Sequence, residues 1–175
     1  MKACAYVVGP SDGAGQALRD MARALGFAVV LPFAGLAAAE TQAHQTPLLF
    51  FLFAAVDEVS ALKPVADSIR FSPGRRIRLS PLVYFAESPS HDQIRLCIDM
   101  GFDDVITLPF TPQRITGRLK RMVERPIVFH ETGAYLGPER RSTASDLRSQ
   151  YRRLEIMRTA NAGVSVLRDE MRPGG

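Results

Sequence analysis

The amino-acid sequence predicts an α/β protein in which a five-stranded parallel sheet is covered by helices on both faces. Short apolar runs alternate with helix-like patterns up to about residue 125 of the 175, and this alternation is typical of strands joined by crossover helices. The third apolar run, LLFFLF at 48–53, has no polar position. Such a run favours a strand that is buried on both faces in the middle of the sheet.

The composition is that of an ordinary globular protein, with 46% apolar and 23% charged residues. The longest apolar run, PLLFFLFAAV at 47–56, is about half as long as a membrane span requires, and the N-terminus has no signal-peptide pattern. We therefore expect a cytoplasmic protein without membrane contact. Cys4 and Cys97 each lie among apolar residues, which favours buried thiols over a disulfide or a metal site.

The net charge of +4 comes almost wholly from arginine, since lysine occurs only at Lys2, Lys63 and Lys120. Guanidinium groups bind carboxylates and phosphates in a forked geometry, so this bias matters more than the net charge. Neither residues 1–125 nor residues 126–175 are basic enough to indicate a nucleic-acid-binding protein.

The elements predicted in the first half of the chain follow one another closely. We expect strands at 3–8 and 27–33, an Ala-rich helix at about 35–44, and two amphipathic helices with apolar positions at Leu18, Met21, Ala22 and Leu25 and at Leu62, Val65, Ala66 and Ile69. Gly26 ends the first of these helices. The stretch FSPGRRIRLS at 71–80 is predicted to be a loop.

The second half supplies the last two strands, at 81–88 and 104–108. Ser90 with Gln93 predicts a capping box at the start of the helix between them. Thr111 is the expected N-cap of the final helix, with a proline at its first position. Five strands and five helices in strict alternation fit a flavodoxin-like three-layer sandwich with strand order 2-1-3-4-5.

A C-terminal extension is predicted after Pro126, because the alternation stops there. We expect a linker or docking segment up to residue 143, then a helix at about 144–158 whose narrow apolar side consists of Leu147, Tyr151 and Leu154. A helix with so narrow an apolar side has to pack on a partner helix or on a second copy of the chain. The end of the chain is predicted to be disordered.

The stretch GFDDVITLPF at 101–110 resembles the end of the receiver domain of bacterial response regulators, the CheY-like domain of two-component signal transduction. In that family a Gly-x-Asp-Asp lead-in precedes the last strand, and Lys-Pro-Phe follows it. The likeness covers about residues 1–125 through the order and lengths of the elements, and it implies a phosphorylation site at the carboxyl-terminal edge of the sheet.

That resemblance also shows what this chain lacks. It places the metal-binding acidic pair on Val8 and Gly9 and the phosphoacceptor aspartate on Leu52. It places the Ser/Thr sensor on Ala86, the switch aromatic on Val105 and the lysine on Leu108. The chain has no carboxylate between Glu40 and Asp57, so a small shift of register restores no acceptor. We interpret residues 1–125 as a degenerate receiver, or pseudo-receiver, that binds no metal or other cofactor. The alternative is that Asp12, Asp57 and Glu87 regroup to hold a metal ion.

Two arginine-containing stretches are candidate binding sites. GRRIRLS at 74–80 brings Arg75, Arg76 and Arg78 together, either as a solvated surface or as a site for an anionic nucleotide such as a cyclic dinucleotide. YLGPERR at 135–141 is similar to a segment that follows the domain in some receiver-like proteins. It combines Tyr135 with Arg140 and Arg141, and it is either a strap on its own domain or a motif for a partner.

The sequence therefore predicts a regulatory protein without enzymatic activity. The first hypothesis is a phosphorylation-independent protein–protein interaction module that forms a homodimer and uses residues 90–125 and the extension as contact surfaces. The alternative hypothesis is a sensor of anionic nucleotides. No nucleophile, base and orienting group can be assembled from the motifs, which disfavours an enzyme.

Overall fold

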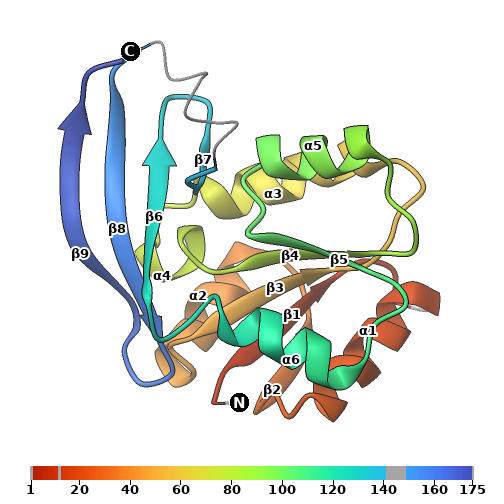
Figure 1. Ribbon diagram of the computed structural model, residues 1–175. Coiled ribbons are helices and arrows are strands. Elements are labelled where there is room, and N and C mark those ends of the chain that lie inside the picture. Colours follow the sequence, from red (N-terminus) through yellow and green to blue (C-terminus); the bar gives the residue numbers. More distant parts are fainter. Residues whose placement is uncertain (1, 12, 141–148, 175) are drawn as a thin grey trace.

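The structure, a computed structural model, describes residues 2–11, 13–140 and 149–174. It contains two sheets (Figure 1). One is a parallel sheet of five strands in the order β2-β1-β3-β4-β5, and the other is an antiparallel sheet of four strands in the order β7-β6-β8-β9. The parallel sheet confirms the predicted fold class and strand order.

The parallel sheet and its helices form the first part of the chain. Its strands are β1 (Cys4–Val8), β2 (Val29–Pro32), β3 (Leu49–Phe53), β4 (Leu82–Ala86) and β5 (Asp104–Thr107). Its helices are α1 (Gly13–Ala24), α2 (Leu36–Gln45), the short 3₁₀ helix η1 (Val59–Leu62), α3 (Lys63–Arg70), α4 (Arg75–Arg78), α5 (His91–Asp99) and α6 (Pro112–Lys120).

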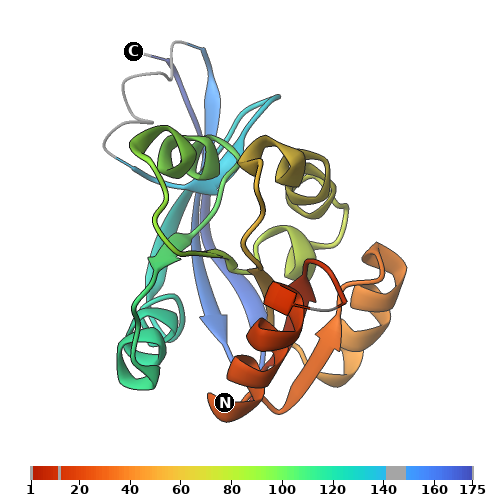
Figure 2. The ribbon, with the colours of Figure 1, turned by 90° about the vertical axis from the view of Figure 1, so that its right-hand side faces the viewer.

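Two apolar cores lie on opposite faces of the parallel sheet. Because side chains alternate along a strand, β3 contributes Phe51 and Phe53 to the core under α2, α3 and α5, and Phe50 and Leu52 to the core under α1 and α6. All five residues of β3 are buried, as the apolar run predicts. Figure 2 shows these helices on the two sides of the sheet.

Local signals place the helix ends and the thiols as expected. The Ser90 side chain accepts a hydrogen bond from the backbone N–H of Gln93, and the Gln93 side chain accepts one from Ser90, which completes the predicted capping box of α5. Thr111 caps α6 in the same way through the N–H of Arg114. Cys4 and Cys97 are buried free thiols, and burial raises the pKa of each to about 12.

The predicted loop at 71–80 was wrong in part, because it contains the one-turn helix α4. The N–H groups of Ile77 and Arg78 both donate to the carbonyl of Gly74. Ile77 is buried in the core under α2 and α3, and this packing stabilises a turn that the loop-forming residues around it do not predict.

The predicted C-terminal helix was also wrong. The extension is an antiparallel sheet of β6 (Pro126–Glu131), β7 (Leu136–Pro138), β8 (Tyr151–Thr159) and β9 (Gly163–Arg172). Leu154, Ile156 and Arg158 are buried at every second position of β8, which is the period of a strand. Tyr151 and Leu154 also fit a helical spacing, and only pairing with β6 and β9 decides between the two periods.

The second strand of the hairpin, β9, continues to Arg172, next to the end of the chain for which disorder is expected. The turn between β8 and β9 depends on Gly163, which has a φ of 73°. A Cβ at this position would lie 2.4 Å from the carbonyl oxygen of Pro47, so the hairpin approaches the parallel sheet more closely than any other residue type allows.

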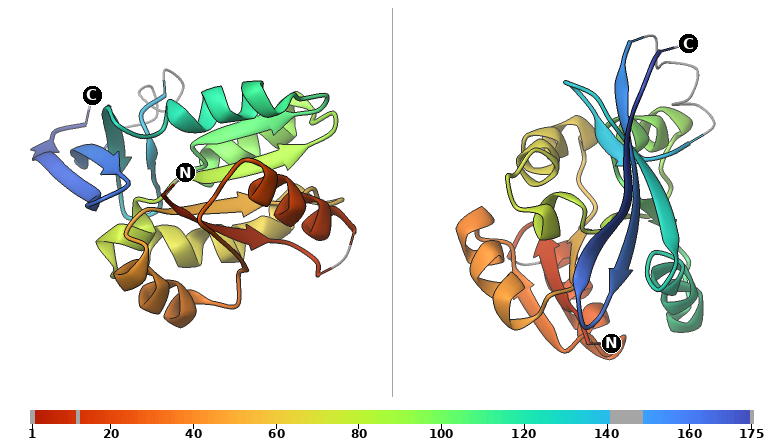
Figure 3. Two further views of the ribbon diagram at one scale, coloured as in Figure 1. Left: turned by 90° about the horizontal axis from the view of Figure 1, so that it is seen from below. Right: turned by 90° about the vertical axis from the view of Figure 1, so that its left-hand side faces the viewer.

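The second sheet covers the amino-terminal ends of the parallel strands. Its inner face packs Phe129, Leu154 and Ile156 against Leu79, which comes just before β4. Pro47, next to the hairpin turn, comes just before β3. Both views of Figure 3 show the second sheet at this one end of the parallel strands. The opposite, carboxyl-terminal edge is left to the loops of the parallel sheet.

Among the helices that the structure describes, none is long and apolar enough to cross a lipid bilayer.

Candidate functional site

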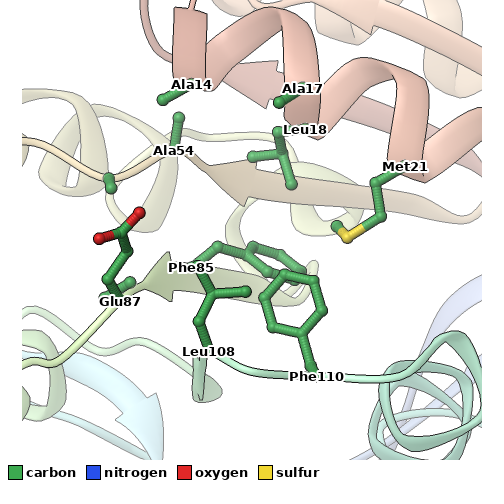
Figure 4. Close-up of a pocket in the computed structure, with 11 residues that line it drawn as sticks. Ala14, Ala17, Leu18, Met21, Ala54, Phe85, Glu87, Leu108 and Phe110 are labelled. Carbon is green, nitrogen blue, oxygen red and sulfur yellow. The ribbon is translucent and has the colours of Figure 1, made fainter.

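A pocket opens at the carboxyl-terminal edge of the parallel sheet, where the strand-to-helix loops gather (Figure 4). Its volume is about 310 Å³. The lining comes from α1 and from the ends of β3, β4 and β5, and consists of Ala14, Ala17, Leu18, Met21, Ala54, Ala55, Phe85, Ala86, Glu87, Leu108 and Phe110. In Figure 4 the side chains of α1 lie opposite Phe85 and Phe110. Glu87 is the one charged residue among these eleven.

The structure brings some of the predicted degenerate positions into this pocket and excludes others. Ala86 and Leu108 line it. Leu52 does not, because it lies within β3, and Ala54 on the same face is the residue at the edge. Val105 packs at the margin of the core under α5. The sequence analysis missed Ala54, because the apolar run continues to Val56 and does not show at which residue the strand ends.

Small residues close the pocket where a receiver would carry its acidic groups. A Cβ on Gly9, the residue after β1, would lie 2.7 Å from the Cβ of Ala54. Two neighbouring loops therefore touch through residues with almost no side chain, whereas Val8 is buried in the sheet. A side chain at position 9 would therefore press against Ala54.

The metal alternative finds no support among the described residues, which contain no group of three or more His, Cys, Asp or Glu able to hold a metal ion. Asp57 and Glu87 are both exposed. Asp12 lies outside the described residues. With apolar walls and a single carboxylate, this pocket can bury apolar groups, but it offers neither a phosphoacceptor in β3 nor a lysine to neutralise a phosphoryl group.

The opposite edge of the sheet holds a buried charge network that the sequence analysis did not predict. Asp103, just before β5, accepts hydrogen bonds from Arg70 and Arg158, with N–O distances of 2.7 Å in each pair. Its side chain is 4% exposed, and those of Arg70 and Arg158 are 1% and 0% exposed. The backbone N–H of Leu82 also donates to Asp103 at 2.9 Å. Arg158 belongs to β8, so this network joins the two sheets.

Backbone carbonyls complete the network. Arg70 donates to the carbonyls of Gly101 and Ser80, at 3.0 and 2.8 Å, and Arg158 donates to the carbonyl of Leu79 at 2.7 Å. Both guanidinium groups also lie over the ring of Phe129, 5.5 and 5.1 Å from its centroid. The two cations are thus held by several partners each, as buried charges require.

Electrostatics keep the network ionised. Burial alone would raise the pKa of Asp103, but Arg158 and Arg70 hold the pKa of this carboxyl below its usual range. Burial lowers the pKa of Arg70, and Asp103 opposes that effect. The second aspartate of the Gly-x-Asp-Asp lead-in therefore has a different role from the first: Asp103 is buried between arginines, whereas Asp104 forms a partly exposed pair with Arg118.

The YLGPERR segment is a strap on its own domain. Leu136, Gly137 and Pro138 are buried in β7, and a Cβ on Gly137 would lie 2.7 Å from the Cα of Gly101. The Tyr135 hydroxyl donates to the carbonyl of Pro138, and burial raises the pKa of Tyr135 to about 12. Arg140 donates to the carbonyls of Phe102 and Asp103.

Four further residues proposed for the tail fall into two groups. Arg141 and Leu147 lie outside the described residues. Tyr151 and Leu154 lie in β8, where Tyr151 contacts the ring of His130 and Leu154 packs against the parallel domain. The two residues point to opposite faces of the second sheet, so they cannot form one apolar stripe.

Two carboxylates lie beside the arginines of the α4 region. Arg78 forms an ion pair with Glu131 of β6, and Arg76 donates to the carbonyl of Ala43 at 3.0 Å. The pocket beside them contains Asp169 of β9, which is 2.5 Å from Arg152. Because Glu131 and Asp169 lie next to Arg75 and Arg78, an anion at this cluster would meet negative charge that the sequence does not show.

Comparisons with known proteins address the fold. No protein-family profile and no curated protein matches the sequence. A CheY-like protein (tadZ) from Pseudomonas aeruginosa PAO1 has a similar structure, with a TM-score of 0.50 and 15% identity over 67% of this chain and 98% of that chain.

Two further solved structures match. A candidate response regulator from Chloroflexus aurantiacus has a TM-score of 0.47 and 18% identity over 70% of this chain and 98% of that chain. A two-component response regulator from Clostridium difficile has a TM-score of 0.44 and 15% identity over 69% and 94%. Identity this low establishes the fold alone: the protein has a receiver-domain fold, to which the second sheet is added.

Proposed function

We propose that the protein is a pseudo-receiver: a phosphorylation-independent interaction module of bacterial signal transduction, without catalytic activity of its own. The observation that carries this proposal is the apolar pocket at the carboxyl-terminal edge of the sheet. Ala54, Ala86 and Leu108 lie where a phosphoryl group would need an acceptor, a hydroxyl donor and a cation. An edge of this kind favours one fixed conformation over a switch between two.

The surface of α5, β5 and α6 is the proposed contact surface for a protein partner. It lies at the side of the parallel sheet away from β2, and Ile94 and Ile98 of α5, both partly exposed, lie along it beside Val105 of β5 and Arg118 of α6. We also propose a homodimer through this surface. The second sheet is less suited to that role than the sequence indicates, because its inner face is already buried against its own domain.

The experiment that tests phosphorylation independence is incubation of the full chain with acetyl phosphate and Mg²⁺, followed by intact mass spectrometry. We expect no phosphoryl adduct, because no described carboxylate lies in β3 or in the pocket except Glu87. A conventional receiver domain treated in parallel is the positive control. An adduct on the wild-type chain that Glu87→Gln or Asp57→Asn removes would overturn the proposal.

Light scattering coupled to size-exclusion chromatography tests the dimer. The full chain is expected to elute as a dimer, and Ile98→Arg, which places a charge on the side of α5 next to β5 and α6, is expected to shift it toward a monomer. A monomer at all concentrations would contradict the homodimer but not the lack of phosphorylation.

A further inference from the structure

A second, polar groove lies at the seam between α6 and the two sheets. Its volume is about 490 Å³, and it is lined by Asp103, Asp104, Arg114, Arg118, Arg121, Met122, Arg125 and Arg140. Five of these eight residues are arginines. This size is within the range of sites that hold small molecules.

The arginines are brought together by helix periodicity and by the strap. Four arginines follow one side of α6 and of the turn after it, because they are spaced by four, three and four residues: Arg114, Arg118, Arg121 and Arg125. Ile115 and Leu119 occupy the other side and are buried. Arg140 reaches the groove from the end of β7, where the carbonyls of Phe102 and Asp103 fix its guanidinium group.

The acids in this groove are already matched. The carboxylate of Asp104 accepts a hydrogen bond from the Nε of Arg118 at 2.7 Å. Asp103 is held by Arg70 and Arg158. Among the described residues that line the groove, positive charge is therefore in excess, and Arg114, Arg121 and Arg125 carry it on exposed side chains. In the α4 cluster, by contrast, Glu131 and Asp169 lie among the arginines.

The lining indicates which anion would fit. Among the described residues that line it there is no aromatic ring, so a base would find only guanidinium groups to stack on. Several guanidinium groups in one concave site favour an anion that presents two or more phosphate groups, because each phosphate can accept a forked pair of hydrogen bonds.

We propose that this groove binds the diphosphate group of a small molecule. The site goes beyond the proposed interaction function, although it shares α6 and β5 with the proposed contact surface. Because the groove is built from α6, from the start of β5 and from the strap, a bound diphosphate links the receiver-like part to the second sheet.

The test is isothermal titration calorimetry of the full chain with sodium pyrophosphate at constant ionic strength. We expect one site per chain, and at least a tenfold weaker affinity in the double variant Arg114→Gln/Arg121→Gln. Arg95→Gln and Arg75→Gln are matched controls, because each removes one exposed arginine elsewhere on the surface. Both controls are expected to bind pyrophosphate as the wild type does.

Other ligands sharpen the test. Stronger binding of a nucleoside diphosphate than of pyrophosphate would identify a nucleotide as the ligand, and equal binding would identify an inorganic diphosphate; both support the site. The proposal is overturned if pyrophosphate does not bind at millimolar concentration, if the double variant binds as tightly as the wild type, or if an acidic peptide binds the groove while pyrophosphate does not.

Discussion

The two ends of the parallel sheet differ in both chemistry and exposure. At the carboxyl-terminal edge an apolar pocket is open to solvent, and Leu108 on its rim is 41% exposed. At the amino-terminal edge three charged side chains, Arg70, Asp103 and Arg158, are buried beneath a second sheet. A receiver would be expected to concentrate its charges at the first edge, so this protein has the reverse arrangement.

The difference separates an open, apolar edge from one that a buried charge network joins to a second sheet. This network attaches β8 to the loops before β4 and β5. The extension therefore packs on the parallel domain through both apolar and charged contacts.

The largest expected effect comes from breaking the buried network. Asp103→Ala leaves Arg70 and Arg158 buried without their carboxylate, and we expect the free energy of unfolding to fall by about 3–5 kcal/mol. Urea denaturation followed by circular dichroism measures this change. Asp104→Ala is the matched control, since its partly exposed pair with Arg118 contributes about 1 kcal/mol or less. Equal losses in both variants would mean that the network does not hold the two sheets together.

The same network predicts a dependence of stability on pH. The pKa of Asp103 is lowered in the folded state, so near pH 4 the unfolded chain binds more protons than the folded chain. The contribution of Asp103 is present above about pH 4 and is lost as the pH falls through the lowered pKa.

Urea titrations of the wild type and of Asp103→Asn at several pH values measure that contribution. We expect the gap in free energy of unfolding between them to be widest near neutral pH and to narrow as the pH falls below about 4. A gap that stays constant down to about pH 2 would contradict a lowered pKa.

The smallest expected effect comes from the open edge. Leu108→Lys restores the lysine that the receiver resemblance implies, and we expect it to change the free energy of unfolding by less than about 1 kcal/mol, because an exposed lysine can keep its amine in water. Leu79→Lys is the matched substitution at the closed edge, where 2% of the side chain is exposed. It is expected to cost about 3 kcal/mol or more, measured by thermal unfolding. Similar losses in the free energy of unfolding in both variants would mean that the two edges tolerate a lysine equally well.

Much of the parallel domain could be predicted from the sequence, because its signals are local. The apolar run of β3, the capping box at Ser90 and the proline after Thr111 each act within a few residues, and the structure agrees with them. The turn at α4 could not be predicted in this way, since the burial of Ile77 depends on helices from other parts of the chain.

The candidate sites show the same division. The receiver resemblance places Ala86 and Leu108 at the carboxyl-terminal edge of the sheet, and both line the pocket there. Ala54 was missed because only strand pairing shows where β3 ends: Val8 pairs with Phe53, which leaves Ala54 at the edge. The groove of α6 was missed because Arg140 reaches it from a strand that was not predicted.

The sequence by itself determined the layered α/β domain and the apolar residues at its carboxyl-terminal edge, since both follow from residue types at positions along single elements. Only the tertiary structure decided the fate of residues 126–175. Leu154 and Arg158 in β8 are compatible with either period until β6 and β9 pair with that strand. Arg158 can be buried only because it forms an ion pair with Asp103, which lies 55 residues earlier in the chain.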